Sequence, residues 1–264
     1  MNTKTIFLAF IAFFSFTACQ NTPESAPADM SIQATEDGKV LLRFKPQAGE
    51  TMRMLMEINS QGSEIGDSKF ALNFALNALG RQDSLYSYEL DIERARLNTN
   101  LSGFKVDYDS NLPARGMAEA IDQQIRPFID NNIAMLMNDR AQIQQIDSES
   151  FGQNMHMTQV DFNNMSIPLP TQPVGVGDTW TASHQKDGES KDFEFRVARI
   201  TQSEVFVEML PINENLGDQE GNLSLTGSYV LDRNTGFTKT GEIKNQIQVM
   251  GQNINNTITF KQIN

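Results

Sequence analysis

Apolar and polar residues alternate with a period of two along most of the sequence after Val40. In residues 86–93, Tyr, Tyr, Leu and Ile occupy the even positions, and Ser, Glu, Asp and Glu occupy the odd ones. Successive side chains of a β-strand point to opposite faces, so this pattern predicts a strand with one buried face and one wet face. The same alternation recurs in residues 52–58, 223–231, 243–249 and 254–260. One-sided alternation is typical of antiparallel sheets, so we expect a mainly β fold of about ten strands in a meander-like order.

One segment, residues 113–126, has a helical spacing of apolar residues instead. Residues 109–111 (Asp-Ser-Asn) come just before it and offer N-cap side chains. Pro127 predicts that the helix ends or kinks there, because proline lacks the backbone N–H that a helix interior needs. We therefore expect one central helix within the β fold.

Residues 128–137 and 142–146 predict a hairpin that turns at residues 138–140, whereas residues 147–166 fit a helix and a loop equally well. Residues 46–52 and 173–180 share a proline, a glycine, an acid and a threonine in nearly the same order. Two similar β units, at about 40–110 and 170–264, would explain this match, and so would a generic way of starting a strand.

The first residues predict export. Lys4 precedes an apolar run over residues 6–16, which is too short to span a bilayer as a permanent helix and fits a secretory signal peptide. Cys19, the only cysteine of the sequence, follows a Thr-Ala pair. This pattern resembles the lipobox of bacterial lipoproteins, which implies cleavage before Cys19 and attachment of lipid to its sulfur. Gln20 in place of aspartate resembles the sorting signal for the outer membrane.

These features predict three parts: a signal peptide over residues 1–18, a lipid-anchored flexible tether over 19–37, and a single β-rich domain over 38–264. The tether follows from its prolines, alanines and polar residues, which leave few large apolar side chains to bury. We accordingly expect a cell-envelope protein attached to the outer membrane, on its periplasmic or surface face, by the Cys19 lipid.

The formal net charge is −12, and the basic residues are scattered rather than clustered. Nucleic acid is therefore excluded as a partner. His156 and His184 are the only histidines, and the sequence contains no Gly-x-Ser-x-Gly elbow, phosphate loop or His-Glu-x-x-His motif. We expect neither an enzyme nor a cofactor.

Methionine is the one unusual component, with 13 residues. Five of them follow strand parity and are predicted to point to the inner face of the sheet: Met52, Met54, Met56, Met135 and Met137. Methionine is flexible, so such a face can be a packed core or the lining of a site for an apolar ligand.

A third methionine cluster, Met155-His156-Met157, does not fit a strand face. Thioether and imidazole groups suit copper(I), so this cluster supports the hypothesis of an exported copper-binding protein.

Several short motifs resemble a family of uncharacterised lipoproteins of Bacteroidetes-type bacteria, with a wider likeness to the curved-sheet lipoprotein-carrier folds. They are Phe44-Lys-Pro46-x-x-Gly49-Glu50-Thr51, Val106-Asp-Tyr108-Asp109-Ser110, Pro168-Leu-Pro170, Val176-Gly177-Asp178-Thr179-Trp180 and Thr235-Gly236-Phe237. The resemblance implies an antiparallel curved sheet or half-barrel around the helix, and it supplies no catalytic residue.

The leading function hypothesis is thus a non-enzymatic module that binds an apolar ligand or an envelope partner. The alternative is a structural or assembly lipoprotein with a solid core.

Overall fold

The computed structural model describes residues 38–62, 66–101, 104–147, 167–186, 189–215, 222–249 and 252–263. These residues contain twelve strands and one helix. The elements are β1 (Thr51–Gly62), β2 (Gly66–Gln82), β3 (Leu85–Leu101), β4 (Phe104–Asp109), α2 (Met117–Ile129), β5 (Ile133–Met137), β6 (Ile143–Ile146), β7 (Thr179–Lys186), β8 (Glu189–Ile200), β9 (Glu204–Asn215), β10 (Asn222–Asp232), β11 (Thr238–Val249) and β12 (Gln252–Ile263).

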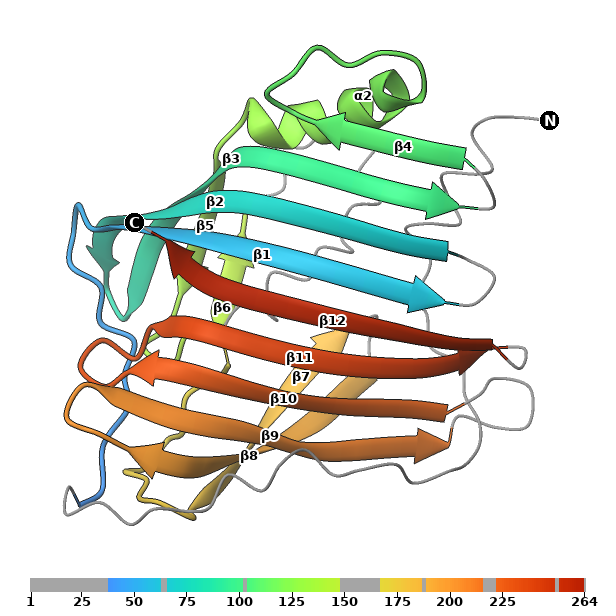
Figure 1. Cartoon of the computed structure of the whole chain (residues 1–264). Helices are drawn as coiled ribbons and strands as arrows, with labels where there is room; N and C mark the ends of the chain where they lie inside the picture. The colour runs from blue at the N-terminus through green and yellow to red at the C-terminus, as the bar shows by residue number, and fades with distance from the viewer. Residues whose placement is uncertain are drawn as a thin grey trace.

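All twelve strands belong to one antiparallel sheet. Their order is β6-β5-β3-β2-β1-β12-β11-β10-β9-β8-β7, and the sheet is open because β6 and β7 end this order without pairing with each other. The long strand β3 has two neighbours on its outer side, β5 along its first half and β4 along its second half. Figure 1 shows a broad layer from β4 to β9, with β5 and β6 behind it at one edge and β7 behind it at the other. The predicted mainly β, antiparallel curved sheet is confirmed, with two more strands than expected.

Strand β1 shows how the alternation creates the two faces of the sheet. Met52, Met54 and Met56 are each less than 5% exposed, as their parity predicts. Met54 lies opposite Phe74 on β2, and Met56 lies opposite Phe260 on β12. Such directly opposed apolar pairs are the packing units that stabilise a sheet, so the inner face is continuous across the seam between β1 and β12.

Strand β2 departs from simple alternation, because it is buried on both faces. Ala71 and Ala75 lie on its outer face and are 3% and 2% exposed. Arg53 lies opposite Ala75, and its Nε atom lies 2.8 Å from Oε1 of Glu93 on β3. The ion pair therefore crosses over the small alanine and shields it, which explains how apolar residues occupy a face that elsewhere is polar.

Helix α2 starts and ends later than predicted. It runs from Met117 to Ile129 instead of over residues 113–126, and Pro127 lies inside its last turn rather than ending it. Its N-cap is Gly116, which makes no side-chain cap hydrogen bond, so residues 109–111 do not cap the helix. Asp109 instead forms an ion pair with Arg94 of β3, because the pairing of β3 with β4 brings the two side chains together.

Helix α2 is fastened to the end of β4. Tyr108 donates a hydrogen bond of 3.0 Å to Asp122, and Arg126 donates one of 2.8 Å to the carbonyl oxygen of Ser110. Ala118, Ile121, Ile125 and Phe128 form the buried face of the helix. It packs on β3 and β4, beside the upper edge of the sheet in Figure 1.

The predicted hairpin after the helix is confirmed as β5 and β6, with its turn at residues 138–140. Its first strand begins at Ile133 rather than at residue 128, because α2 occupies the positions up to Ile129. Residues 148–166 lie outside the described residues, so the choice between a helix and a loop stays open there.

Residues 38–50 form a strap across one end of the strands, drawn in blue at the left of Figure 1. The N–H of Phe44 donates to Asp139 in the β5–β6 turn at 2.7 Å, and the N–H of Lys45 donates to Thr235 in the β10–β11 turn at 3.0 Å. At its start, Val40 pairs with Val174 in the segment before β7. The strap thus connects three parts of the fold that are not neighbours in the strand order.

Gly236, in the β10–β11 turn, lies against the strap. Its φ angle is +68°, and a Cβ atom built there would lie 2.6 Å from the carbonyl oxygen of Arg43 in the strap. Only glycine adopts this conformation without strain and leaves room for the strap backbone.

The turn before β1 is held by a compact set of contacts. Gly49 has a φ angle of +84°, and its N–H donates to Ala78 of β2 at 2.8 Å. The N–H of Ala78 returns a bond of 2.9 Å to the carbonyl oxygen of Glu50. The Glu50 carboxylate accepts a bond of 2.9 Å from the N–H of Gln47.

The turn before β7 repeats these contacts. Gly177 has a φ angle of +87° and donates to Val197 of β8 at 2.8 Å, and Val197 donates back to Asp178 at 3.0 Å. The Asp178 carboxylate accepts a bond of 2.9 Å from the N–H of Gly175. Ala78 and Val197 are also each followed by a β-bulge. The organisation into two similar β units stays a prediction. Two such units would be expected to begin with turns of the same kind, as these two turns do.

Within the described residues, no helix is long and apolar enough to cross a membrane.

Candidate functional site

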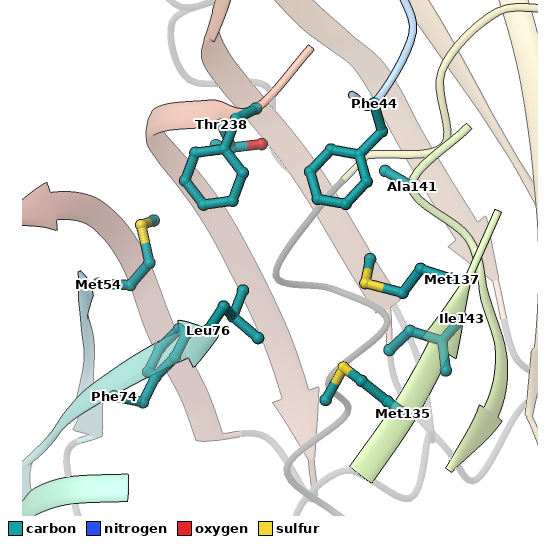
Figure 2. Close-up of a pocket in the computed structure, with 10 residues that line it drawn as sticks. Phe44, Met54, Phe74, Leu76, Met135, Met137, Ala141, Ile143 and Thr238 are labelled. Carbon is teal, nitrogen blue, oxygen red and sulfur yellow. The ribbon is translucent and has the colours of Figure 1, made fainter. Parts of the chain in front are cut away.

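A small hollow lies on the inner side of the sheet, and Figure 2 shows the residues that line it. The lining residues are Phe44, Met54, Phe74, Leu76, Met135, Met137, Ala141, Ile143, Phe237 and Thr238. Its free volume is about 30 Å³, enough for about two water molecules. In the conformation of the structure the hollow is therefore far smaller than the roughly 300–1,000 Å³ of a pocket for a drug-sized ligand.

Two distant parts of the sheet form facing walls. Met54, Phe74 and Leu76 project from β1 and β2, and Met135 and Met137 project from β5 on the other side of the hollow. The sheet can face itself in this way because β5 pairs with the first half of β3 and bends behind the main layer (Figure 1). Both walls are apolar, so the hollow is surrounded by side chains that favour hydrocarbon over water.

The strap closes one end of the hollow. The Phe44 ring is 2% exposed, and its centroid lies 5.7 Å from that of Tyr88 and 6.0 Å from that of Phe237. Burial raises the pKa of Tyr88 far above its usual range, and the neighbouring groups Tyr86 and Glu50 act in the same direction. Tyr88 therefore stays neutral, and its buried hydroxyl has no hydrogen-bond partner among the described residues.

Among the described residues that line the hollow, only Thr238 has an oxygen or nitrogen atom in its side chain. It is 3% exposed at the start of β11, opposite Leu231 of β10. No group of the described residues forms a hydrogen bond with its Oγ1 atom. The hollow thus combines an apolar lining with one unsatisfied hydroxyl.

The structure brings together three of the five methionines predicted as a ligand site, since Met54, Met135 and Met137 line the hollow. Met52 and Met56 are buried on the same face but do not belong to the lining. The ligand-binding role of all five stays a prediction.

Sequence reasoning missed seven lining residues: Phe44, Phe74, Leu76, Ala141, Ile143, Phe237 and Thr238. Phe44 and Phe237 belong to segments without strand periodicity, and only tertiary contacts place them at the hollow. Phe74 and Leu76 could have been found from the even-position run of apolar residues in β2.

Other predicted sites fall outside the described residues. This holds for the lipidation site Cys19 and for the copper-binding candidates Met155, His156 and Met157, which stay predictions. In the part of the chain that the structure describes, no three His, Cys, Asp or Glu side chains are grouped so that they could hold a metal ion.

Among the described residues, the lining can pack against apolar atoms, and none of its side chains is charged. Pockets for drug-sized ligands commonly measure about 300–1,000 Å³, so a ligand of that size enters only if the lining side chains move. Methionine has three rotatable side-chain bonds and adapts to irregular spaces at low cost. The methionine walls are hence the part of the lining best able to move.

Comparison with known proteins gives a likeness of fold alone. The sequence matches no family model and no curated protein. Among solved structures it is similar to lipovitellin, with a TM-score of 0.52 and 11% identity over 83% of this chain. The match covers 25% of the lipovitellin chain, so this chain spans about a quarter of that length. A LolA superfamily protein from Nitrosomonas europaea matches with a TM-score of 0.20 and 9% identity, over 82% of this chain and 87% of that one, and this score is too low to relate the folds.

Proposed function

We propose that the chain is a lipid-anchored protein of the bacterial envelope, held at the outer membrane through Cys19. Its curved sheet binds an apolar ligand, or an apolar part of an envelope partner, without catalysis. The observation that carries this proposal is the pair of apolar walls on β1–β2 and β5, which face each other across the hollow of Figure 2. Flexible methionines on both walls suit a surface that repacks around varied ligands.

The fold comparison supports the same proposal. The matching lipovitellin structure is described by its lipid–protein interactions. An open curved sheet with an apolar inner face can separate its walls without breaking a closed ring of hydrogen bonds, because its two edge strands do not pair. Ligand binding then requires changes in side chains and in the strap, while the ladder of the sheet stays intact.

A second candidate function is a structural or assembly role with a solid core. The observation that favours it is the free volume of about 30 Å³, which leaves little unfilled space between the two apolar walls. The two candidates differ in whether the hollow opens for a ligand, and a binding measurement separates them.

The test uses the purified full chain with Cys19→Ala, which lacks an acyl chain of its own that could occupy the hollow. A fluorescent fatty-alcohol probe is titrated against this protein and against a second variant carrying Ala141→Met. Ala141 lines the hollow and is 5% exposed, so the larger side chain should fill the space and reduce probe affinity at least tenfold.

The matched control is Ala182→Met. Ala182 is also 5% exposed, but it lies on β7 and does not line the hollow. Probe binding by the parent chain, with loss in Ala141→Met and retention in Ala182→Met, supports the ligand site. No binding by the folded parent chain leaves the structural candidate in place.

A further inference from the structure

Burial of the Thr238 hydroxyl lowers the stability of the fold. A hydroxyl removed from water without a new hydrogen bond costs free energy, and valine has nearly the same shape without this cost. Thr238 is 3% exposed, and its Oγ1 atom has no partner among the described residues. Ile243 and Ile247, at later positions of β11, are both aliphatic and buried. An aliphatic residue would therefore fit the strand better at position 238, unless the hydroxyl has a partner outside the described residues, such as a bound ligand.

The position of Thr238 fixes where such a partner would lie. Figure 2 shows Thr238 and Phe44 at one end of the hollow, with Met135 and Phe74 toward the other. The strap covers the Thr238 end, since its Phe44 ring stacks against Phe237, the residue before Thr238. A bound molecule with a polar group at Thr238 would extend its apolar part between the methionine walls.

The hollow also determines the charge of that polar group. None of the ten lining residues has a charged side chain. A carboxylate bound there would be buried without a counter-ion, which is far more costly than burying a neutral group. The threonine hydroxyl both donates and accepts, so it suits a hydroxyl or a carbonyl oxygen.

We propose that the ligand is a neutral amphiphile, such as a long-chain alcohol or ester, whose single polar group hydrogen-bonds to Thr238 Oγ1 while its hydrocarbon lies between the β1–β2 and β5 walls. This inference rests on the proposed function and names the ligand class of the same site. It distinguishes the ligand from a bare hydrocarbon and from a fatty-acid anion.

The test compares three competitors of equal chain length, 1-dodecanol, dodecane and dodecanoate, at a pH where dodecanoate is ionised. Each displaces a neutral apolar dye from the full chain carrying Cys19→Ala. We expect 1-dodecanol to bind most tightly, and Thr238→Val to weaken its binding about tenfold while dodecane affinity stays unchanged. Thr238→Ser should keep the preference, because it retains the hydroxyl.

The matched control is Thr99→Val. Thr99 on β3 is 4% exposed and its hydroxyl also has no hydrogen-bond partner within the described ranges, but it does not line the hollow. This variant should leave all three affinities as they are. Equal loss in both threonine variants, or tightest binding of dodecanoate, would overturn the inference. If dye and competitors bind equally well with and without the Thr238 hydroxyl, the inference fails and the proposed function stands. If the folded parent chain binds neither dye nor competitor, the proposed function fails as well.

Discussion

Replacing Gly236 with alanine tests how the strap is held. The new Cβ atom would lie 2.6 Å from the carbonyl oxygen and 2.8 Å from the carbonyl carbon of Arg43, and 2.9 Å from Cδ1 of Leu169. Two of these neighbours are backbone atoms, so a side-chain rotation cannot relieve the overlap. Either the turn or the strap must move.

The expected loss has two parts. A residue other than glycine in the left-handed region costs about 1–2 kcal/mol, and the φ angle of +68° places Gly236 there. Overpacking of a well-packed site typically costs a further ~1–3 kcal/mol. We therefore expect Gly236→Ala to lower the free energy of unfolding by about 2–5 kcal/mol.

Gly177→Ala is the matched control, because Gly177 has a φ angle of +87° and no heavy atom within 4 Å of the added Cβ. It should show only the conformational part, about 1–2 kcal/mol. Urea unfolding followed by circular dichroism measures both variants, and limited proteolysis within residues 38–50 reports a released strap. Equal losses in the two variants, with an equally protected strap, would refute the close contact between strap and turn.

Three further outcomes are expected. Cys19→Ala should abolish palmitate incorporation and membrane fractionation, since no other thiol exists; a variant that still incorporates label would disprove the anchor. Burial holds the pKa of Tyr88 and Tyr229 above the usual value of about 10, so their contribution to stability is complete below about pH 10 and declines as the pH rises further. Tyrosinate absorbance should show both rings ionising only as the fold is lost, and ionisation in the native state would contradict this. Hydrogen bonds from Arg94 and Arg126 lower the pKa of Asp109 and Asp122 respectively, so their stabilisation is present above about pH 3.9 and is lost as the pH falls through the lowered values. Circular dichroism during acid titration should show that the parent chain unfolds at a lower pH than the Asp122→Leu variant. Equal midpoint pH values would exclude a role for the Asp122–Arg126 pair.

Alternation was enough to predict the class of fold and the inner face of several strands. Met54 and Met137 are far apart in sequence, and parity placed both of them on the buried side, as the structure does. Parity could not show that these two methionines face each other across a hollow. That arrangement depends on the backward bend of β5 along β3, which no local sequence pattern encodes.

The missed features have a common physical reason, since each depends on a partner from another strand. The outer face of β2 also holds an apolar residue, Ala75, because the Arg53–Glu93 ion pair, whose members come from β1 and β3, covers it. The sequence offered Asp109 as a helix cap, but Arg94 binds it once β3 and β4 have paired. The sequence therefore showed that Asp109 is a hydrogen-bonding residue, but the tertiary contact with Arg94 determined which partner it has.

The seam between β1 and β12 has a consequence for folding kinetics. It pairs Arg53 with Ile263 and Gly62 with Ile254, so residues about 200 positions apart must meet, whereas the pairs within β1–β3 and within β7–β12 join strands that follow each other in sequence. Closing so large a loop is entropically costly, and folding slows as contacts become less local. The meanders β1–β3 and β7–β12 should form first and expose two unpaired edges with apolar faces until the seam closes. Refolding yield should consequently fall as protein concentration rises, because the same edges can pair between molecules.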